Sequence, residues 1–290
     1  MALEQYLKCI QSFYPALKTN RVEWNHTGQN NDIVFLNDEW VFRFPKHDQA
    51  LSSLQTEYEQ LAFIRSYISL PIPDPHFVNT DTNTLGQAFF GYRKIHGHPL
   101  NPETILEAEP SDRQSIANEL VTFLNQLHSI PIADAPGEKV TGNEGFQNWT
   151  HLFTDIKENL FPHMKPLKRI EVAEHFEAFL GNKTQIDFSP ALIHGDFGST
   201  NILYDHHLKN LSGIIDFGSC HIGDPAIDFA GLYKHYGEDF IKLMIPHYPG
   251  LSDLFPRIHF YSGTFALQEA LYGHRYKDEE AFKNGLKEYV

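Results

Sequence analysis

Two short apolar segments, each followed by an aspartate, restrict the fold of this 290-residue chain more than any other feature. The first covers residues 191–194 and precedes Asp196, and the second covers residues 211–215 and leads directly into Asp216. Asn201 lies five positions after Asp196. Short apolar runs that end in polar and glycine residues are typical of buried strands with loops behind them. We therefore expect two strands whose following loops carry these side chains to one place.

The three polar side chains suit the transfer of a phosphoryl group. Such a reaction needs a carboxylate that orients the attacking hydroxyl and accepts its proton, and it needs oxygen ligands for Mg²⁺. An aspartate and an asparagine on one loop, with an aspartate at the start of the next, can supply these groups. The order and spacing match the kinase catalytic loop H-x-D-x-x-x-x-N and the D-F-G that holds the metal. His-Gly-Asp or Asp-Phe-Gly alone could be an ordinary turn, but the combination favours the catalytic interpretation.

Beyond these motifs, the chain resembles the aminoglycoside phosphotransferase and choline kinase superfamily. The likeness covers nearly the whole chain and is closest to the aminoglycoside 2''-phosphotransferases. Besides the catalytic and D-F-G segments, the similar stretches are WVFRFPKH (40–47), LPIPDP (70–75), FFGYRKIHG (89–97) and LYGHRYKDEEAFKNGLKEY (271–289). The resemblance implies an α+β fold of the bilobal protein-kinase type, with a small β-rich lobe before a larger helical lobe.

The resemblance also implies roles for individual residues. Asp196 would be the catalytic base, Asn201 and Asp216 would be magnesium ligands, and His194 would be a structural member of the catalytic loop. At the position of Asn201 the 2''-phosphotransferases commonly carry His, so the chain departs from them there and agrees with other branches. Asp228, in the segment GDPAIDFAGL, is expected to have a structural role near the catalytic loop.

The residue patterns predict two regions with the ligand site in the cleft between them. Residues 1–95 are expected to form a nucleotide-binding β-sheet lobe with one helix, and residues 96–290 a helical lobe that holds the catalytic loop and the acceptor site. Ser111 and Gln114 have capping-box spacing at the start of a helix. The predicted helices cover residues 3–13, 49–68, 111–129, 146–160 and 167–180, the predicted strands cover 21–25, 33–36, 40–44, 86–95, 191–194, 200–204 and 211–215, and the chain is expected to be mostly helical from about residue 225.

Glu57 lies within the apolar stripe of the helix predicted over residues 49–68. A buried carboxylate there is unfavourable unless a cation meets it, and the alternative is that it reaches solvent at the helix edge. The available cations are Arg43 and Lys46, and the resemblance puts Arg43 at the family's lysine position. We expect Arg43, paired with Glu57, to contact the nucleotide phosphates through its planar fork. Lys46, which lies beyond Pro45, is interpreted as a surface residue.

Two further segments are candidates for nucleotide binding. Residues 26–32 lie where a phosphate-covering loop is expected, although Gly28 is their only glycine and the segment could be a simple turn. The segment that contains Tyr92, Arg93 and Ile95 resembles the hinge that holds a purine through backbone groups, and it could also be an ordinary strand end. Its side chains do not distinguish ATP from GTP.

Composition limits the partners. Lys and Arg number 23 against 37 Asp and Glu, which gives a formal net charge of −14, and no basic stripe indicates a nucleic-acid partner. An acidic surface favours cationic partners, although it is also an ordinary aid to solubility. The 2 cysteines and the lack of a signal-peptide layout or a membrane-length apolar run predict a cytoplasmic protein without a membrane partner. The sequence contains neither HExxH nor a Cys/His cluster with zinc spacing.

The sequence therefore predicts a phosphotransferase that uses Mg²⁺ and moves the γ-phosphate of ATP or GTP to a hydroxyl of a small cationic molecule. An aminoglycoside is the first choice, which would make the protein an antibiotic-resistance enzyme. The alternatives are another small alcohol (a choline-like amine, homoserine, a sugar or a macrolide) and a catalytically silent nucleotide-binding regulatory module. A protein acceptor is disfavoured because no Ala-Pro-Glu segment follows the D-F-G. Glu238, Asp239 and Glu269 are candidate acceptor-binding acids, and the sequence does not specify an oligomeric state.

Overall fold

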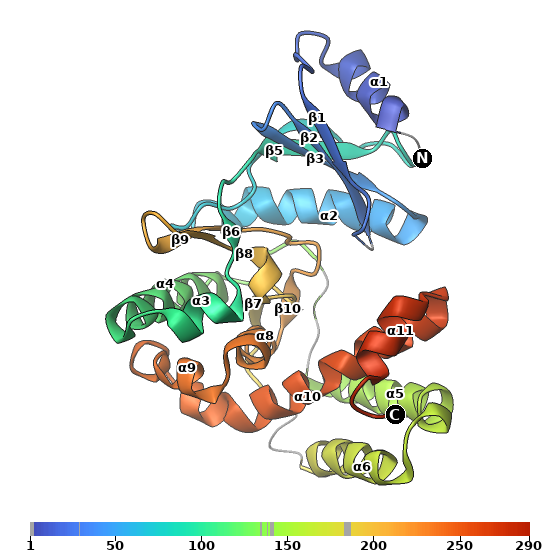
Figure 1. The fold of residues 1–290 in the computed structure, drawn as a ribbon, viewed down its shortest axis with the longest axis vertical. Helices are drawn as coiled ribbons and strands as arrows, with labels where there is room; N and C mark the ends of the chain where they lie inside the picture. Colours follow the sequence, from blue (N-terminus) through green and yellow to red (C-terminus); the bar gives the residue numbers. More distant parts are fainter. Residues whose placement is uncertain (1–2, 29, 134, 138, 140–141, 183–186) are drawn as a thin grey trace.

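The structure is a computed structural model that describes residues 3–28, 30–133, 135–137, 139, 142–182 and 187–290. A β-sheet region forms the N-terminal part, and a mainly helical region forms the C-terminal part (Figure 1). This arrangement confirms the predicted α+β architecture of a small β-rich lobe followed by a larger helical lobe.

Five antiparallel strands build the N-terminal region, in the order β1-β2-β3-β5-β4. Helix α1 packs against one face of this sheet and α2 against the other (Figure 1). The elements are α1 (Leu3–Phe13), β1 (Val22–Asn25), β2 (Asn31–Leu36), β3 (Trp40–Pro45), α2 (Asp48–Ile64), β4 (Pro75–Asn79) and β5 (Phe89–Arg93).

The side-chain alternation of β3 decides which residues meet each helix. Phe42 and Phe44 pack with Tyr6 of α1 in one apolar cluster, whereas Val41 belongs to the core that contains α2. Since successive side chains of a strand point to opposite faces, Arg43 lies on the same side as Val41. The alternation of side chains along β3 therefore places the Arg43 guanidinium next to helix α2.

Strand β4 lies at the edge of the sheet, where Val78 is opposite Phe90 of β5. The sequence patterns do not predict this strand, because Pro71, Pro73 and Pro75 indicate a stiff connection. A proline is compatible with the first residue of an edge strand, where its missing N–H needs no ladder partner. The sheet therefore includes a segment for which the sequence patterns predict no strand.

The C-terminal region places helices around two small sheets (Figure 1). Strand β7 pairs with β10, and β8 lies between β6 and β9. The elements are β6 (His98–Pro99), α3 (Pro102–Glu107), α4 (Pro110–His128), α5 (Gly142–Asn159), η1 (Phe161–His163), α6 (Pro166–Leu180), β7 (Ala191–Ile193), η2 (Ser199–Asn201), β8 (Ile202–Asp205), β9 (Asn210–Ile214), β10 (His221–Gly223), α8 (Ala226–Tyr236), α9 (Glu238–Lys242), η3 (Ile245–His247), α10 (Leu251–Tyr276) and α11 (Glu279–Leu286).

The capping box predicted at the start of α4 is wrong. The helix begins at Pro110, with Glu109 at the N-cap position and no side-chain cap hydrogen bond. Proline is well suited to the first helical position, so the helix starts one residue early and Ser111 falls inside it. Gln114 is used elsewhere, because its side-chain N–H donates to Asn118 Oδ1 at 2.9 Å.

A continuous apolar core joins the two regions. It contains Val41 and Leu61 from the N-terminal region together with Leu124, Phe197 and Ile258 from the C-terminal region. The predicted boundary at residues 95–96 falls between β5 and β6, so this core extends across it. No helix within the described ranges is long and apolar enough to cross a lipid bilayer.

Candidate active site

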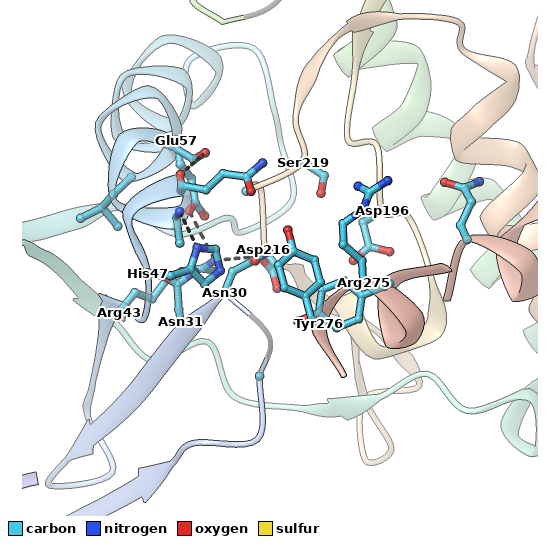
Figure 2. Close-up of a pocket in the computed structure, with 18 of the residues that line it drawn as sticks. Asn30, Asn31, Arg43, His47, Glu57, Asp196, Asp216, Ser219, Arg275 and Tyr276 are labelled. Carbon is cyan, nitrogen blue, oxygen red and sulfur yellow. Dashed lines mark hydrogen bonds and ion pairs between the residues drawn. The ribbon is translucent and has the colours of Figure 1, made fainter. Parts of the chain in front are cut away.

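A cleft of about 850 Å³ lies between the two regions. Its walls come from β2, β3 and α2 on one side and from the catalytic loop, α5 and α10 on the other (Figure 2). Five of the predicted site residues line it, namely Gly28, Arg43, Glu57, Asp196 and Asp216. Residues from sequence positions 28 to 216 therefore meet around a single cavity.

Asn201 orients Asp196 within the catalytic loop. Its side-chain N–H groups donate to the backbone oxygen and to Oδ2 of Asp196, each at 2.9 Å. Asn201 is buried and is not among the cleft-lining residues, while its backbone oxygen accepts the Ile215 N–H at 2.9 Å. Asp196 is exposed, so its carboxylate is both oriented and accessible.

The ring of His194 is buried and connects the two loops that carry the aspartates. Its Nε2 lies 3.0 Å from the Ile215 backbone oxygen, and the Asp196 N–H donates to Nδ1 at 3.3 Å. A ring with its proton on Nε2 and an acceptor at Nδ1 satisfies both contacts. This placement agrees with the structural role that the resemblance implies.

Asp228 fastens the catalytic loop to helix α8. Its carboxylate accepts the backbone N–H groups of His194 and Gly195, both at 2.8 Å, and a contact from His128 Nε2 at 3.0 Å. Complete burial opposes ionisation of Asp228, but the hydrogen bonds from His128 and the backbone outweigh it and hold the pKa below its usual value. The expected structural role of Asp228 is therefore confirmed.

Two residues of the catalytic segments have left-handed backbone. Gly195 has φ 79°, and a Cβ atom there would lie only 2.3 Å from the Ser219 backbone oxygen. Asp216 has φ 66°, an uncommon value for a residue with a side chain. Such backbone persists where surrounding contacts hold it and is frequent at functional sites.

Arg43, Glu57 and Asp216 form what we call the buried charge cluster. The Arg43 guanidinium lies 3.3 Å from Glu57 Oε2 and 2.8 Å from Asp216 Oδ1. The side chains of Arg43 and Glu57 are 6% and 4% exposed, whereas that of Asp216 is 46% exposed. The prediction that Glu57 is buried and paired with Arg43 is confirmed, and the alternative that it reaches solvent is wrong.

The two carboxylates that share the Arg43 guanidinium have pKa values shifted in opposite directions. Arg43 lowers the pKa of Asp216, so the carboxylate that faces the cleft is ionised. Burial raises the pKa of Glu57 to about 7, against the opposing effect of Arg43. Within the described part of the chain, Glu57 Oε1 and Arg43 Nε are buried without a hydrogen-bond partner. The cluster therefore retains polar groups that a ligand or water can satisfy.

Lys46 is partly exposed, in agreement with its interpretation as a surface residue, but its ammonium group is engaged in contacts. Its ammonium group donates to the backbone oxygens of His26 and Gly28 and lies 3.7 Å from Asp32 Oδ1. Its own backbone N–H donates to the oxygen of Asn30 at 2.9 Å, so the chain beyond β3 stays alongside the opposite loop. Lys46 therefore clamps the candidate phosphate-covering loop, while Arg43 faces the cleft.

The predicted hinge residues do not line this cleft. Tyr92 is buried in the core, and the Arg93 guanidinium lies 3.1 Å from Glu39 and over the ring of Trp40. Neither they nor Ile95 are among the cleft-lining residues. A contact between this segment's backbone and a purine stays a prediction.

Several cleft residues were not anticipated from sequence. They lie on α5 and α10, where helical periodicity predicts an element but not its function. The acids Glu238, Asp239 and Glu269, considered from sequence, are not among the residues that line the cleft. The unanticipated polar lining residues on these two helices are Asp155, Gln268, Tyr272, Arg275 and Tyr276.

The donor atoms of Asp216 and Asn201 fit a hard divalent cation. The Asp216 carboxylate is ionised and half exposed, with Oδ1 held by Arg43. The amide nitrogen of Asn201 donates to Asp196, which leaves the amide oxygen as a ligand atom. Among the described residues, no group of three His, Cys, Asp or Glu side chains could hold a metal alone. This sparse donor set suits Mg²⁺, which is usually bound by one or two protein groups together with substrate phosphates.

The comparisons with known proteins agree with this geometry. The family model "Phosphotransferase enzyme family" matches residues 23–249. Viomycin phosphotransferase from Streptomyces vinaceus is 32% identical over 203 residues, which cover 68% of this chain and 67% of the relative. Acyl-CoA dehydrogenase family member 11 from Homo sapiens is 27% identical over 174 residues, 58% of this chain but only 21% of that protein.

Solved structures match over almost the full length. The GDP and kanamycin complex of APH(2'')-IIIa has a TM-score of 0.89 and 25% identity, and covers 97% of this chain and 96% of that one. The fold is shared with a macrolide 2'-phosphotransferase type I, with a TM-score of 0.79, 18% identity and coverage of 99% of this chain and 96% of that one. The chain therefore belongs to the phosphotransferase enzyme family and is a small-molecule kinase with a protein-kinase-like fold.

Proposed function

We propose that this kinase moves the γ-phosphate of ATP or GTP to a hydroxyl of a small cationic molecule, with an aminoglycoside as the acceptor. The observation that carries the proposal is the position of Asp196 and Asp216 on one cleft, with Arg43 beside them. These groups can orient a hydroxyl and neutralise a polyphosphate at the same time. Charge and relatives further define the acceptor.

In this proposal, Asp196 orients the acceptor hydroxyl and receives its proton, while Asn201 fixes the carboxylate through Oδ2. Arg43 steadies the donor phosphates from β3, and Glu57 holds its guanidinium in place. Asp216 and Asn201 would hold Mg²⁺, which supplies positive charge at the phosphates when it is bound. Transfer is direct, without a phospho-enzyme.

Charge and the relatives both support the proposed acceptor class. The protein carries a formal net charge of −14, and the cleft is lined by the carboxylates of Glu57, Asp155, Asp196 and Asp216. A cationic acceptor is attracted to such a surface. One structural relative was solved with kanamycin, and a sequence relative is named for viomycin. These make an aminoglycoside the first candidate and viomycin the second.

The donor and the compartment belong to the same proposal. Structural relatives at 25% identity were solved with GDP, so GTP should be tested beside ATP.

The two cysteines, Cys9 and Cys220, are unpaired. Free thiols are typical of a reducing compartment, and we place the enzyme in the cytoplasm.

The test is a panel of acceptors offered with ATP and with GTP in the presence of Mg²⁺, and read by nucleoside diphosphate release. The panel contains kanamycin, gentamicin, viomycin, a macrolide, choline and homoserine. We expect a cationic antibiotic to stimulate turnover, and Asp196→Asn to lower kcat about 1,000-fold because the general base is lost. Turnover with another alcohol alone would retain the kinase and reject the acceptor. Turnover that survives Asp196→Asn would reject the role of Asp196, and no turnover with any acceptor would favour a silent module.

A further inference from the structure

Arg275 places a second guanidinium on the cleft, in addition to that of Arg43. The lining includes four carboxylates but only two arginines, Arg43 and Arg275, among the described residues. A nucleoside triphosphate adds further negative charge, which catalysis of phosphoryl transfer must offset. Each cation within the cleft therefore matters for the reaction.

The two arginines reach the cleft from opposite sides. Arg43 comes from β3 in the N-terminal region, whereas Arg275 comes from the last turn of α10, on the same side as the catalytic loop with Asp196 (Figure 2). Arg43 is buried between Glu57 and Asp216 and cannot follow the transferred group. Arg275 lies on the side where the acceptor hydroxyl is oriented.

The backbone that carries Arg275 is fixed by packing. A Cβ atom on Gly273 would lie 2.2 Å from the Phe282 nitrogen and 2.7 Å from the Asp278 oxygen, so α11 packs directly against α10 at this point. The ring of Tyr272 packs against that of Tyr276, with 4.6 Å between the ring centroids. The end of α10 therefore holds Arg275 at a defined place on the cleft wall.

The guanidinium itself is held only loosely. It donates to Asp155 Oδ2 of α5 at 3.3 Å, and the two side chains are 65% and 43% exposed. Exposed ion pairs of this length contribute little to stability, so the Asp155–Arg275 contact, here called the exposed pair, can open readily. Asp155 also lines the cleft, where it can receive an ammonium group of a cationic acceptor in place of Arg275.

We propose that Arg275 is a phosphoryl-binding residue that Asp155 holds until a cationic acceptor takes its place. Arg275 then pairs with the non-bridging oxygens of the phosphoryl group. The bond from the γ-phosphorus to the β–γ bridging oxygen breaks, the bond to the acceptor oxygen forms, and the hydroxyl proton passes to Asp196. An arginine that neutralises this charge in other phosphotransferases increases kcat by orders of magnitude. The inference rests on the proposed phosphotransfer activity.

The experiment compares Arg275→Gln, Arg275→Lys and Asp155→Asn with the wild type and with Arg21→Gln, a control arginine that is also exposed and paired only at the surface. Turnover is measured with whichever panel acceptor the wild type uses, and nucleoside diphosphate binding is measured by calorimetry. We expect Arg275→Gln to lower kcat at least about 100-fold, with the diphosphate Kd changed less than about threefold, and Arg275→Lys to recover part of the loss. Asp155→Asn should raise acceptor KM and increase nucleotide hydrolysis without acceptor.

Failure of this inference differs from failure of the proposed function. If the wild type turns over and Asp196→Asn is inactive, but Arg275→Gln keeps kcat within about twofold, Arg275 does not bind the phosphoryl group. A rise in acceptor KM alone in Arg275→Gln would also overturn the inference, because it would assign Arg275 to acceptor binding. If the wild type shows no turnover with any panel acceptor, the proposed function fails first. The diphosphate Kd then still shows whether the variants are folded and bind nucleotide.

Discussion

Arg43 of the buried charge cluster and Arg275 of the exposed pair line the same cleft but differ in their exposure to solvent. Arg43 is 6% exposed and contacts two carboxylates, whereas Arg275 is 65% exposed and contacts the carboxylate of Asp155. A buried charge must keep its partners, because separation leaves an uncompensated ion, whereas an exposed charge can exchange them. The difference suits the proposed roles, in which Arg43 steadies the donor phosphates and Arg275 exchanges its partner when an acceptor binds.

Removal of Arg43 should have the largest effect on stability. We expect Arg43→Met to reduce the free energy of unfolding by about 3 kcal/mol, because Glu57 remains buried without its cation. Urea unfolding measures this change. The double variant Arg43→Met/Glu57→Leu should recover much of the loss. If Arg43→Met is as stable as Arg21→Met, the buried charge cluster does not differ from a surface pair in the way described.

The pH dependence of stability tests the cluster at Glu57. Its pKa is about 7 in the folded protein and about 4.3 in an unfolded chain. The stabilisation from protonated Glu57 is therefore complete below about pH 4.3 and is lost as the pH rises through about 7. Relative to the wild type, Glu57→Gln should gain up to about 1.4 kcal/mol per pH unit between about pH 4.3 and about pH 7, where the unfolded chain has released the proton that folded Glu57 retains, and the difference should be constant above pH 7. Denaturant unfolding at pH 5, 6, 7 and 8 measures this, and a difference that does not change between pH 5 and pH 7 contradicts the raised pKa.

Substitution of Lys46 is expected to have an effect of intermediate size, which appears in the affinity for nucleotide. Lys46→Met removes the ammonium that holds the backbone oxygens of His26 and Gly28. The candidate phosphate-covering loop loses its clamp, and we expect nucleotide affinity to fall about fivefold, or about 1 kcal/mol. Calorimetric titration with nucleoside diphosphate measures the Kd. Lys283→Met, which breaks an exposed pair on α11, serves as the control and should leave the Kd unchanged.

The smallest effect on stability is expected at the exposed pair. Arg275→Gln should change the free energy of unfolding by less than about 0.5 kcal/mol, because both partners remain solvated. Urea unfolding under the same conditions as for Arg43→Met measures it. A loss comparable to that of Arg43→Met would show that Arg275 is a structural residue, and the contrast between the two arginines would not hold.

Much of the candidate site could be predicted because its residues are close in sequence or follow a regular period. Asp196 and Asn201 share one loop, so their spacing predicts that they lie close together, and Glu57 falls within an apolar helical stripe, so the helical period predicts its burial. The contacts of Lys46 could not be predicted, because its partners, His26 and Gly28, lie on another loop that no local pattern connects to it. Strand β4 was missed because prolines hide an edge strand from local patterns.

The sequence by itself determines three features, because local periodicity and motif spacing specify them. They are the order of the catalytic segments, the burial of Glu57, and the division into a β-rich and a helical region. Only the tertiary structure decided that Arg275 meets Asp155, 120 residues away, and that both lie on the cleft. The physical reason is that helix packing, here the close approach of α11 at Gly273, sets where a side chain on a long helix ends, and no local pattern records that position.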